Sequence, residues 1–440
     1  MTTARPLTLY ERALYGEGLL PGNVILTASL DGTLEEADLR RALAQLQARH
    51  PLLRCLIQTH DGRPWFVPQQ SAPPLPLRIV ARAGHDDWNA WADRELQTPI
   101  DGARFPLARV LWLRGERHHE LIVVCHHAIC DGRALIALLD GLLRACAYPE
   151  QTPAPRDALP AFADLVPAIV RHDPRLQRSI RWRAAALRLL LRLLPQRPTQ
   201  HYGAVYRELW TLDEAATRRL SERCRQEGVS LYAALALAHI QAFREVCGRR
   251  VRRYRAPVDM RRLLPAIGDD ALFGIAPTVE LKPGAPFDGR ARDTFWTRAR
   301  ALQDDLQERI EALGPRTVRN FLGLELLHPV YARMAAYGRA QRAGAELTLS
   351  NLGRLPLAQD YRGLRLRAVR GISGLVGETP AQLLTIAGYA GRLEFVLASD
   401  EDSLPRAQAL RIRERATDLL QALGEAAQTH PANAAPVRAP

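Results

Sequence analysis

Lysine is almost absent from this sequence of 440 residues: Lys282 is the only one, and all other members of the 60 basic residues are arginine. Long apolar runs are missing too, since none reaches the roughly 20 residues that a membrane-spanning helix needs. The N-terminal residues show no apolar stretch behind their charge, and therefore no signal peptide. The lack of a membrane-spanning run and of a signal peptide predicts a cytoplasmic protein.

Cysteine is scarce, with six residues scattered along the chain and none in a CxxC pair. The spacing argues against a zinc ribbon or a redox dithiol. A secreted fold held by disulfides is not expected at this length. The HExxH spacing of helical zinc ligands is also absent, so the sequence predicts no metal site.

What the sequence does contain is apolar residues, at 47%, and a net charge of +13. The apolar content is enough for a packed core, and the length is enough for two domains or two large lobes. A strongly basic protein invites a nucleic-acid interpretation. However, eight arginines and one acid fall within residues 171–198, so the excess is chiefly local. No nucleic-acid-binding motif accompanies it, and we expect no nucleic-acid partner.

Strand-like and helix-like stretches alternate along both halves, which predicts a mixed α/β class. The clearest strands are 23–30, 108–113, 120–125, 205–212, 251–258, 273–282, 345–350, 365–370, 382–389 and 392–399. The clearest helices are 36–49, beginning with a capping box at Thr33–Glu36, then 132–147, 174–195, 213–226, 231–243, 291–313 and 404–424. The expected organisation is an N-terminal lobe at 1–170, a basic interlobe helix within 171–198, a C-terminal lobe at 199–427 and a flexible tail at 428–440.

The strongest chemical signal is His126-His127-x-x-x-Asp131-Gly132, which lies where a strand gives way to a helix. Neighbouring strand residues point to opposite faces, so one histidine should face the core and the other an opening. A neutral histidine can accept a proton from a hydroxyl, amine or thiol. Asp131 fits the N-cap of the following helix, an ion pair that fixes the loop, or both. Gly132 permits close approach of the backbone.

Other nucleophiles and histidines near this motif are weaker candidates. There is no GxSxG elbow, and covalent catalysis by Cys125 or Cys130 is a minor alternative, because Cys125 lies in an apolar strand where an inert thiol is expected. His118 and His119 fall in the polar half of a hairpin and are interpreted as surface residues.

The motif His126–Gly132 resembles HHxxxDG of the condensation-domain superfamily, which includes chloramphenicol acetyltransferase, plant acyltransferases, peptide condensation domains and polyketide-associated acyltransferases. Four further stretches, in family order, are similar to family segments: LEEADLRRALAQLQARHPLLR at 34–54, PVDMR at 257–261, FGIAPTVEL at 273–281 and TLSNLGR at 348–354. The last is most similar to the "SNLG" segment of the polyketide-associated branch.

The resemblance implies two chloramphenicol-acetyltransferase-like lobes in a V-shaped pseudo-dimer, with the site in a tunnel at their interface. It assigns His127 as general base and gives Asp131 a structural ion pair, for which Arg261 is the candidate partner. No bound cofactor is implied; the donor substrate would be an acyl-carrier phosphopantetheine or coenzyme A thioester.

A thioester is already activated, so the chemistry also needs a donor to the developing oxyanion. The Gly132 N–H, Ser350 and Asn351 are candidates, although Ser-Asn before Gly353 is also a turn sequence, and we favour a structural role for it. Asp259 stands where peptide condensation domains usually carry asparagine, and the glutamate that their pattern expects is missing. These departures favour acyl transfer to a hydroxyl or amine.

The basic helix at 174–195 carries Arg178, Arg181, Arg188 and Arg192 on one face and Leu176, Ile180, Leu187, Leu191 and Leu194 opposite, with Leu190 and Leu193 widening the apolar side. One interpretation is a helix packed between the lobes with a solvated basic face. The alternatives are contact with an acidic carrier protein or with an anionic membrane, which would place the protein at the inner membrane face.

The leading hypothesis is an acyltransferase of secondary metabolism or lipid assembly that moves an acyl group from a carrier-protein or coenzyme A thioester to a hydroxyl or amine. Amide-forming condensation is a second hypothesis. A non-catalytic, carrier-binding scaffold of the same fold is a third.

Overall fold

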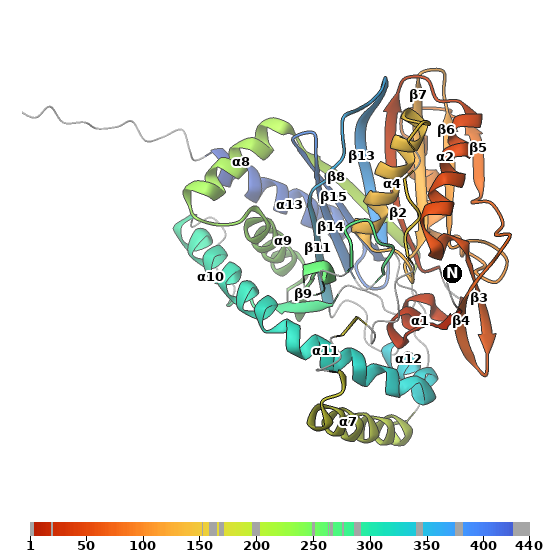
Figure 1. Cartoon of the computed structure of the whole chain (residues 1–440). Coiled ribbons are helices and arrows are strands. Elements are labelled where there is room, and N and C mark those ends of the chain that lie inside the picture. Colours follow the sequence, from red (N-terminus) through yellow and green to blue (C-terminus); the bar gives the residue numbers. More distant parts are fainter. Residues whose placement is uncertain are drawn as a thin grey trace, which may run out of the picture.

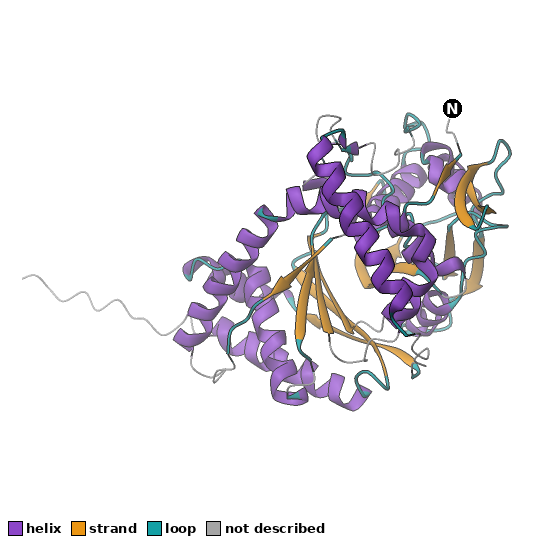
Figure 2. Cartoon of the chain, turned by 90° about the horizontal axis from the view of Figure 1, so that it is seen from below, coloured by secondary structure: helices purple, strands orange, loops and turns teal. Residues whose placement is uncertain are grey.

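Two six-stranded sheets with helices packed on them form the molecule, which confirms the predicted α/β class. The computed structural model describes residues 4–18, 21–151, 153–157, 165–166, 171–195, 203–248, 251–262, 264, 267–274, 277–285, 292–339, 346–374 and 382–425. Figure 1 shows the sheets in two adjoining lobes, and Figure 2 shows the strands surrounded by helices. The tail expected at 428–440 and much of the connection at 148–170 lie outside the described residues.

The N-terminal sheet has the strand order β12-β13-β2-β7-β6-β5. Its strands are β2 (Asn23–Asp31), β5 (Leu77–Ala81), β6 (Ala108–Arg114), β7 (His118–His126), β12 (Asp360–Tyr361) and β13 (Leu364–Gly374). The helices of this lobe are α2 (Glu36–Arg49), α3 (Asp87–Gln97) and α4 (Gly132–Ala147). A separate small sheet joins β1 (Arg5–Pro6), β4 (Arg63–Pro68) and β3 (Cys55–His60), with α1 (Leu9–Tyr15) beside it.

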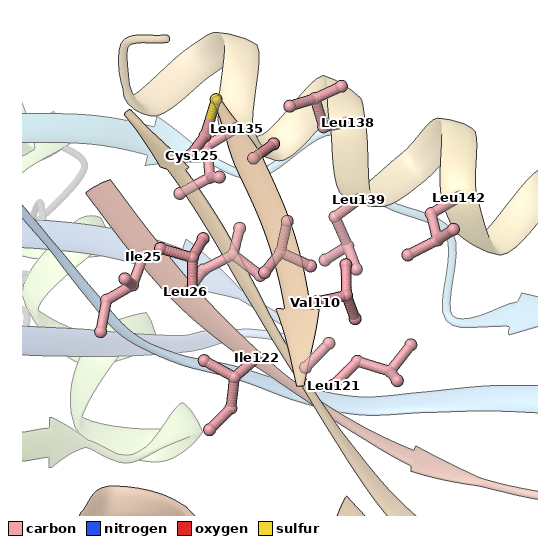
Figure 3. Close-up of a cluster of buried hydrophobic side chains, with 14 of the residues drawn as sticks. Ile25, Leu26, Val110, Leu121, Ile122, Cys125, Leu135, Leu138, Leu139 and Leu142 are labelled. Carbon is pink, nitrogen blue, oxygen red and sulfur yellow. The ribbon is translucent and has the colours of Figure 1, made fainter. Parts of the chain in front are cut away.

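Helix α4 follows the motif and packs on one face of this sheet. Its leucines recur at helical spacing, so one stripe of the helix is apolar. Figure 3 shows Leu139 and Leu142 pointing from the helix toward the strands, and these two side chains are buried together with Leu135 and Leu138. This packing fixes where the N-terminus of α4, and therefore the motif, lies relative to the end of β7.

The C-terminal sheet has the order β10-β9-β11-β14-β15-β8. Its strands are β8 (Val205–Leu212), β9 (Arg253–Pro257), β10 (Thr278–Leu281), β11 (Glu346–Arg354), β14 (Gln382–Tyr389) and β15 (Arg392–Asp400). Its helices are α8 (Glu214–Gln226), α9 (Leu231–Cys247), α10 (Arg292–Glu311) and α13 (Arg406–Glu425). The chain from Leu313 continues through α11 (Leu313–Leu324), the 3₁₀ segment η4 (Glu325–Val330) and α12 (Tyr331–Arg339).

The predicted lobe boundary at 199–427 is wrong in one respect. Strand β13 pairs antiparallel with β2 and, with β12, completes the N-terminal sheet, although both come from the C-terminal half of the chain. The strand pattern at 365–370 predicted a strand but carried no information about its partner. The C-terminal half therefore contributes a segment to the N-terminal lobe, and the lobes cannot be divided at one position.

Polar contacts also join the lobes. Arg207 of β8, with its side chain 1% exposed, donates to Asp93 of α3 at 2.6 Å and to the Gly371 carbonyl of β13 at 3.2 Å. In a second contact, the Leu9 N–H of α1 donates to Glu325 of η4 at 2.8 Å. These contacts make the relative position of the lobes depend on specific side chains.

Several local predictions need correction. Helix α2 begins at Glu36 with Glu35 as N-cap and no side-chain cap, so the capping box predicted at Thr33 is absent. The helix predicted at 291–313 is confirmed as α10, which ends two residues earlier, and a further helix, α11, that was not predicted follows directly. Strand β10 covers only 278–281 of the predicted 273–282, and β11 extends to Arg354, past the predicted end at 350.

Candidate active site

His126 and His127 occupy the end of β7 and the loop that leaves it, and they differ as the alternation predicts. His126 is 1% exposed and packs near Tyr15, with ring centroids 5.5 Å apart. His127 keeps accessible surface. The His127 N–H donates to the Gly22 carbonyl at 2.6 Å, and the His126 N–H donates to the Leu107 carbonyl at 2.8 Å. These two hydrogen bonds hold the backbone of each histidine at the end of β7.

The two imidazoles are both held neutral, for the same main reason. Burial lowers the pKa of His126 to about 3. Its Nδ1 accepts a hydrogen bond from the Ala128 N–H at 3.1 Å, which supports the turn. Burial also lowers the pKa of His127, while the backbone of His127 and Cys130 and the charge of Asp131 oppose that effect. Nδ1 of His127 is buried, so Nε2 is the nitrogen left to meet a substrate.

Asp131 performs both roles that the sequence allowed for it. One carboxylate oxygen caps α4 by accepting from the Ala134 N–H at 2.7 Å. The carboxylate also accepts from both terminal nitrogens of Arg261, at 2.7 and 3.4 Å. The predicted ion pair between Asp131 and Arg261 is therefore present. It joins the motif loop to residues about 130 positions later in the chain.

Arg261 binds more than this one carboxylate. It lies in the 3₁₀ turn Met260–Arg262, its side chain is 4% exposed, and it also donates to Asp259 at 3.2 Å and to the Ala271 carbonyl at 3.0 Å. Asp259 in turn pairs with Arg133, the second residue of α4, at 2.9 Å. Two acids and two arginines thus alternate across the junction between α4 and the 259–271 segment.

Gly274 lets this junction close. The Asp131 N–H donates to the Phe273 carbonyl at 2.9 Å, which brings the 273–274 backbone against the motif loop. A Cβ atom at Gly274 would overlap the His127 carbonyl oxygen, which is backbone and cannot rotate away. Only glycine fits at this contact without moving the loop that carries His127.

A family model described as a condensation domain matches residues 23–252, more than half of the chain. The chain belongs to the condensation-domain family. A second model, described as the C-terminus of phthiocerol/phthiodiolone dimycocerosyl transferase, matches residues 202–397 of this condensation-domain protein.

Comparison with individual proteins agrees with this assignment. The AMB antimetabolite synthetase AmbE of Pseudomonas aeruginosa is 31% identical over 244 residues, covering 50% of this chain but only 10% of that much longer protein. The structure of polyketide synthase associated protein 5 from Mycobacterium tuberculosis matches with a TM-score of 0.66 and 18% identity, covering 96% of this chain and 98% of that chain.

Trichothecene 15-O-acetyltransferase from Fusarium sporotrichioides matches with a TM-score of 0.68 and 12% identity, covering 96% of this chain and 95% of that chain. At such low identities the two structural matches establish the shared fold.

Other predicted residues of the condensation-domain site are placed as follows. Gly132 begins α4 and faces Leu352 of β11, so the "SNLG" segment adjoins the motif. Asn351 is exposed, and its side-chain oxygen accepts from the Gly353 N–H at 3.0 Å, which is the turn geometry that we favoured from the sequence. Ser350 is half-buried and pairs with Thr385 of β14.

The cysteines beside the motif are buried in the core. Cys125 and Cys130 are each fully buried, and burial together with the neighbouring Cys125 raises the pKa of Cys130. Neither thiol is in a position to be an accessible thiolate nucleophile, because a thiolate needs solvation or a cationic environment. Among the described residues no group of three or more His, Cys, Asp or Glu side chains is arranged to hold a metal ion.

The interpretation of His119 as a surface residue is wrong. β7 begins at His118, two residues before the predicted start, so the alternation places His118 outward and His119 inward. His119 is 3% exposed and packs against Trp112, with ring centroids 5.5 Å apart. His118 is exposed, as predicted.

The sequence missed Tyr15, Gly22 and Arg133 as neighbours of the motif. Gly22 and Tyr15 lie in the N-terminal segment, where no periodic pattern indicated structure, and a Cβ at Gly22 would crowd the His126 ring. Arg133 directly follows the motif, but its ion pair is with the distant Asp259, which nothing in the local sequence indicates. Arg181, Arg188 and Arg192 lie on helix α7 (Pro174–Leu193), which packs mainly on α11 and η4 and forms a separate group.

Proposed function

We propose that this condensation-domain protein is an acyltransferase that moves an acyl group from a thioester to a hydroxyl or amine, with His127 as general base. The observation that carries the proposal is the placement of His127. Its imidazole is neutral, its Nδ1 is buried, and its loop is locked by the Asp131–Arg261 ion pair and by Gly274. A fixed, neutral base is what attack on an activated acyl group requires.

In the proposed reaction, Nε2 of His127 takes the proton from the acceptor O–H or N–H as the acceptor attacks the thioester carbonyl. The tetrahedral adduct collapses, the carbon–sulfur bond breaks, and the departing thiolate takes the proton back from the imidazolium. General-base assistance of this kind contributes roughly 10²–10⁴-fold to the rate. No covalent intermediate on the protein is needed, which agrees with the burial of the two neighbouring cysteines.

The developing oxyanion would be stabilised at the start of α4. Asp131 caps the Ala134 N–H, whereas the first N–H groups of a helix have no partner inside it. The Gly132 N–H therefore remains a candidate donor, supported by the positive end of the helix dipole. Asn351 is a weaker candidate, because its side-chain oxygen already accepts from the Gly353 N–H. Ser350 stays a candidate with no contact that favours it.

The proposed donor is an acyl-carrier phosphopantetheine or coenzyme A thioester. The match of residues 202–397 to the phthiocerol/phthiodiolone dimycocerosyl transferase C-terminus supports ester formation in secondary metabolism or lipid assembly. Amide formation is the second candidate, favoured by the 31% identity of half the chain to an antimetabolite synthetase. The third candidate, a non-catalytic carrier-binding scaffold, predicts no turnover with any acceptor.

The test is intact-mass measurement of acyl loss from acyl-carrier proteins and acyl coenzyme A, with matched alcohol and amine acceptors of the same carbon skeleton. The proposal predicts acyl loss that depends on acceptor, and a faster reaction with the alcohol if the ester branch is correct. A faster reaction with the amine would favour condensation. No acceptor-dependent loss from any donor, by a folded protein, would contradict enzymatic acyl transfer.

A further inference from the structure

Helix α7 has two apolar faces, and only one of them is covered. Ile180, Ala184 and Leu191 are buried and lie about one and two turns apart, so they share the side that packs on α11 and η4. Ile180 and Leu191 belong to the apolar face that the sequence predicted, and that part of the face is buried. Figure 1 shows α7 at the outer edge of the molecule, with α11 and α12 on its inner side.

The outer face is the unexpected one. Trp182, Leu189, Leu190 and Leu193 are 74%, 59%, 53% and 73% exposed. Their spacing of seven, eight and eleven residues from Trp182 places them on one stripe of a helix. Leu190 and Leu193, which widen the apolar side on the helical wheel, are therefore not part of the buried face, because the helix buries a narrower stripe than its leucine content suggested.

This concentration of exposed apolar side chains is not typical of the rest of the surface. Across the described ranges, seven large apolar side chains are exposed by more than a third, and five of them lie on α7: Trp182, Leu187, Leu189, Leu190 and Leu193. Contiguous exposed apolar surface on a folded protein marks an interaction site. The outer stripe is therefore a candidate interaction surface.

The charges beside the stripe indicate the chemistry of a partner. Arg178, Arg181 and Arg192 are exposed and flank the stripe on one side, while Arg183 is exposed on the other. Arg188 is only partly exposed, so it contributes less than the predicted basic face assumed. The sequence from Pro174 to Pro195 contains no acidic residue that could neutralise these arginines.

We propose that α7 docks this protein onto an anionic membrane surface, lying parallel to it with Trp182 and the leucine stripe in the interfacial region and the arginines at the lipid headgroups. A basic helix with tryptophan and leucine on its other face has the composition of such an interfacial helix. At about 1.5 Å per residue its 20 residues extend about 30 Å along the surface. Among the described residues no helix is long and apolar enough to pass through a bilayer.

The membrane is favoured over an acidic carrier protein by the shape of the stripe. A single outward-facing helix presents a convex ridge with four large apolar side chains spread over three turns. A ridge of this kind can sink into the fluid headgroup region along its whole length. A small folded partner would need a matching groove to cover Trp182 and Leu193 at once. Carrier binding remains an outcome that the experiment can detect.

The experiment is flotation of the full-length protein with vesicles of phosphatidylcholine alone or with 30% phosphatidylglycerol, at low and physiological salt. Binding is expected only to the anionic vesicles and should weaken as salt rises. The triple variant Arg178→Glu, Arg181→Glu, Arg192→Glu should lower the partition coefficient by roughly 10²-fold or more, at about 1 kcal/mol for each arginine. The matched control reverses the exposed residues Arg218, Arg225 and Arg411 on α8 and α13 and should bind like the wild type.

A second pair of variants tests insertion rather than charge. Trp182→Ser with Leu193→Ser should lower binding while leaving the salt dependence in place. Brominated lipid should quench wild-type fluorescence and should not quench the Trp182→Phe variant, because Trp182 is the most exposed of the seven tryptophans.

The proposal is overturned if the wild type does not float with anionic vesicles, if the control triple loses binding as much as the α7 triple, or if an acidic carrier protein alone binds in an α7-dependent way. Failure of the proposed acyl transfer is separable from failure of docking, because acyl transfer between soluble donor and acceptor should be the same in the α7 variants and the wild type.

Discussion

Replacement of Arg261 by methionine removes the cation that holds the motif loop to the 259–271 segment. Asp131 then loses bonds of 2.7 and 3.4 Å in an environment where its side chain is 11% exposed, and Asp259 loses one of its two arginines. Removing one partner of a buried ion pair costs about 3–5 kcal/mol. Asp131→Asn should cost less, about 2 kcal/mol, because asparagine can still cap Ala134 and Arg261 keeps its other acceptors.

The two changes share one interaction, so their costs should not add. We expect the double variant to be more stable than additivity predicts by about 2 kcal/mol, measured by urea unfolding followed by circular dichroism. Arg133→Met is the control: its ion pair with Asp259 is half-exposed and should contribute at most about 1 kcal/mol. Costs that add to within about 0.5 kcal/mol would refute the account of the ion pair, as would an Arg133 variant that is as unstable as the Arg261 variant.

Three further predictions concern the loop itself. His126→Asn should flatten the pH dependence of stability between pH 6 and 4 by about 1.4 kcal/mol per pH unit, measured by urea unfolding at each pH. Gly274→Ala should lower kcat of acyl transfer by at least about 10-fold with the protein still folded, because the new methyl overlaps the His127 carbonyl and moves the base. Gly132→Ala should destabilise the protein modestly, as judged by its melting temperature, and adding Leu352→Ala should restore that stability, because the new methyl meets only the end of the leucine side chain at 2.7 Å.

The sign of the pH effect follows from the direction of the shift. Above pH 6.5, His126 is neutral in both the folded and the unfolded state. As the pH falls, the unfolded chain takes up a proton near 6.5, whereas the folded protein does not until about pH 3. Stability is therefore lost as pH falls through this window. His50 and His239, with pKa values lowered to about 4 by burial, add similar slopes that the His126 variant keeps. An unchanged slope in that variant would contradict the burial argument.

The sequence predicted the motif site well because its parts are local or strongly patterned. Asp131 as helix cap follows from the sequence position before α4, and the opposite orientations of His126 and His127 follow from strand alternation. The Asp131–Arg261 pair joins distant positions, and only the family resemblance could suggest it. Spacing and periodicity alone carry no information about which of the 60 Lys and Arg residues would reach that carboxylate.

The features that could not be predicted depend on non-local packing. Strand β13 pairs with β2 across more than 300 positions of sequence, and nothing in its pattern distinguishes that partner from a strand of its own half. His119 is buried because β7 starts two residues early, and strand ends are weakly encoded. On α7, the helical wheel groups the apolar positions but carries no information about how wide a stripe the neighbouring helices cover, so it could not show that Leu190 and Leu193 are exposed.

The central claim is that His127 is the base of an acyl transfer reaction. Its most direct test is the kcat/KM of His127→Ala for a carrier-bound acyl thioester and an alcohol acceptor, measured beside the wild type at several pH values. The account predicts a loss of roughly 10²–10⁴-fold with the melting temperature little changed, and a wild-type rate that falls only when the pH drops below the ordinary histidine range. A folded His127→Ala protein that turns over at a near-normal rate would contradict it.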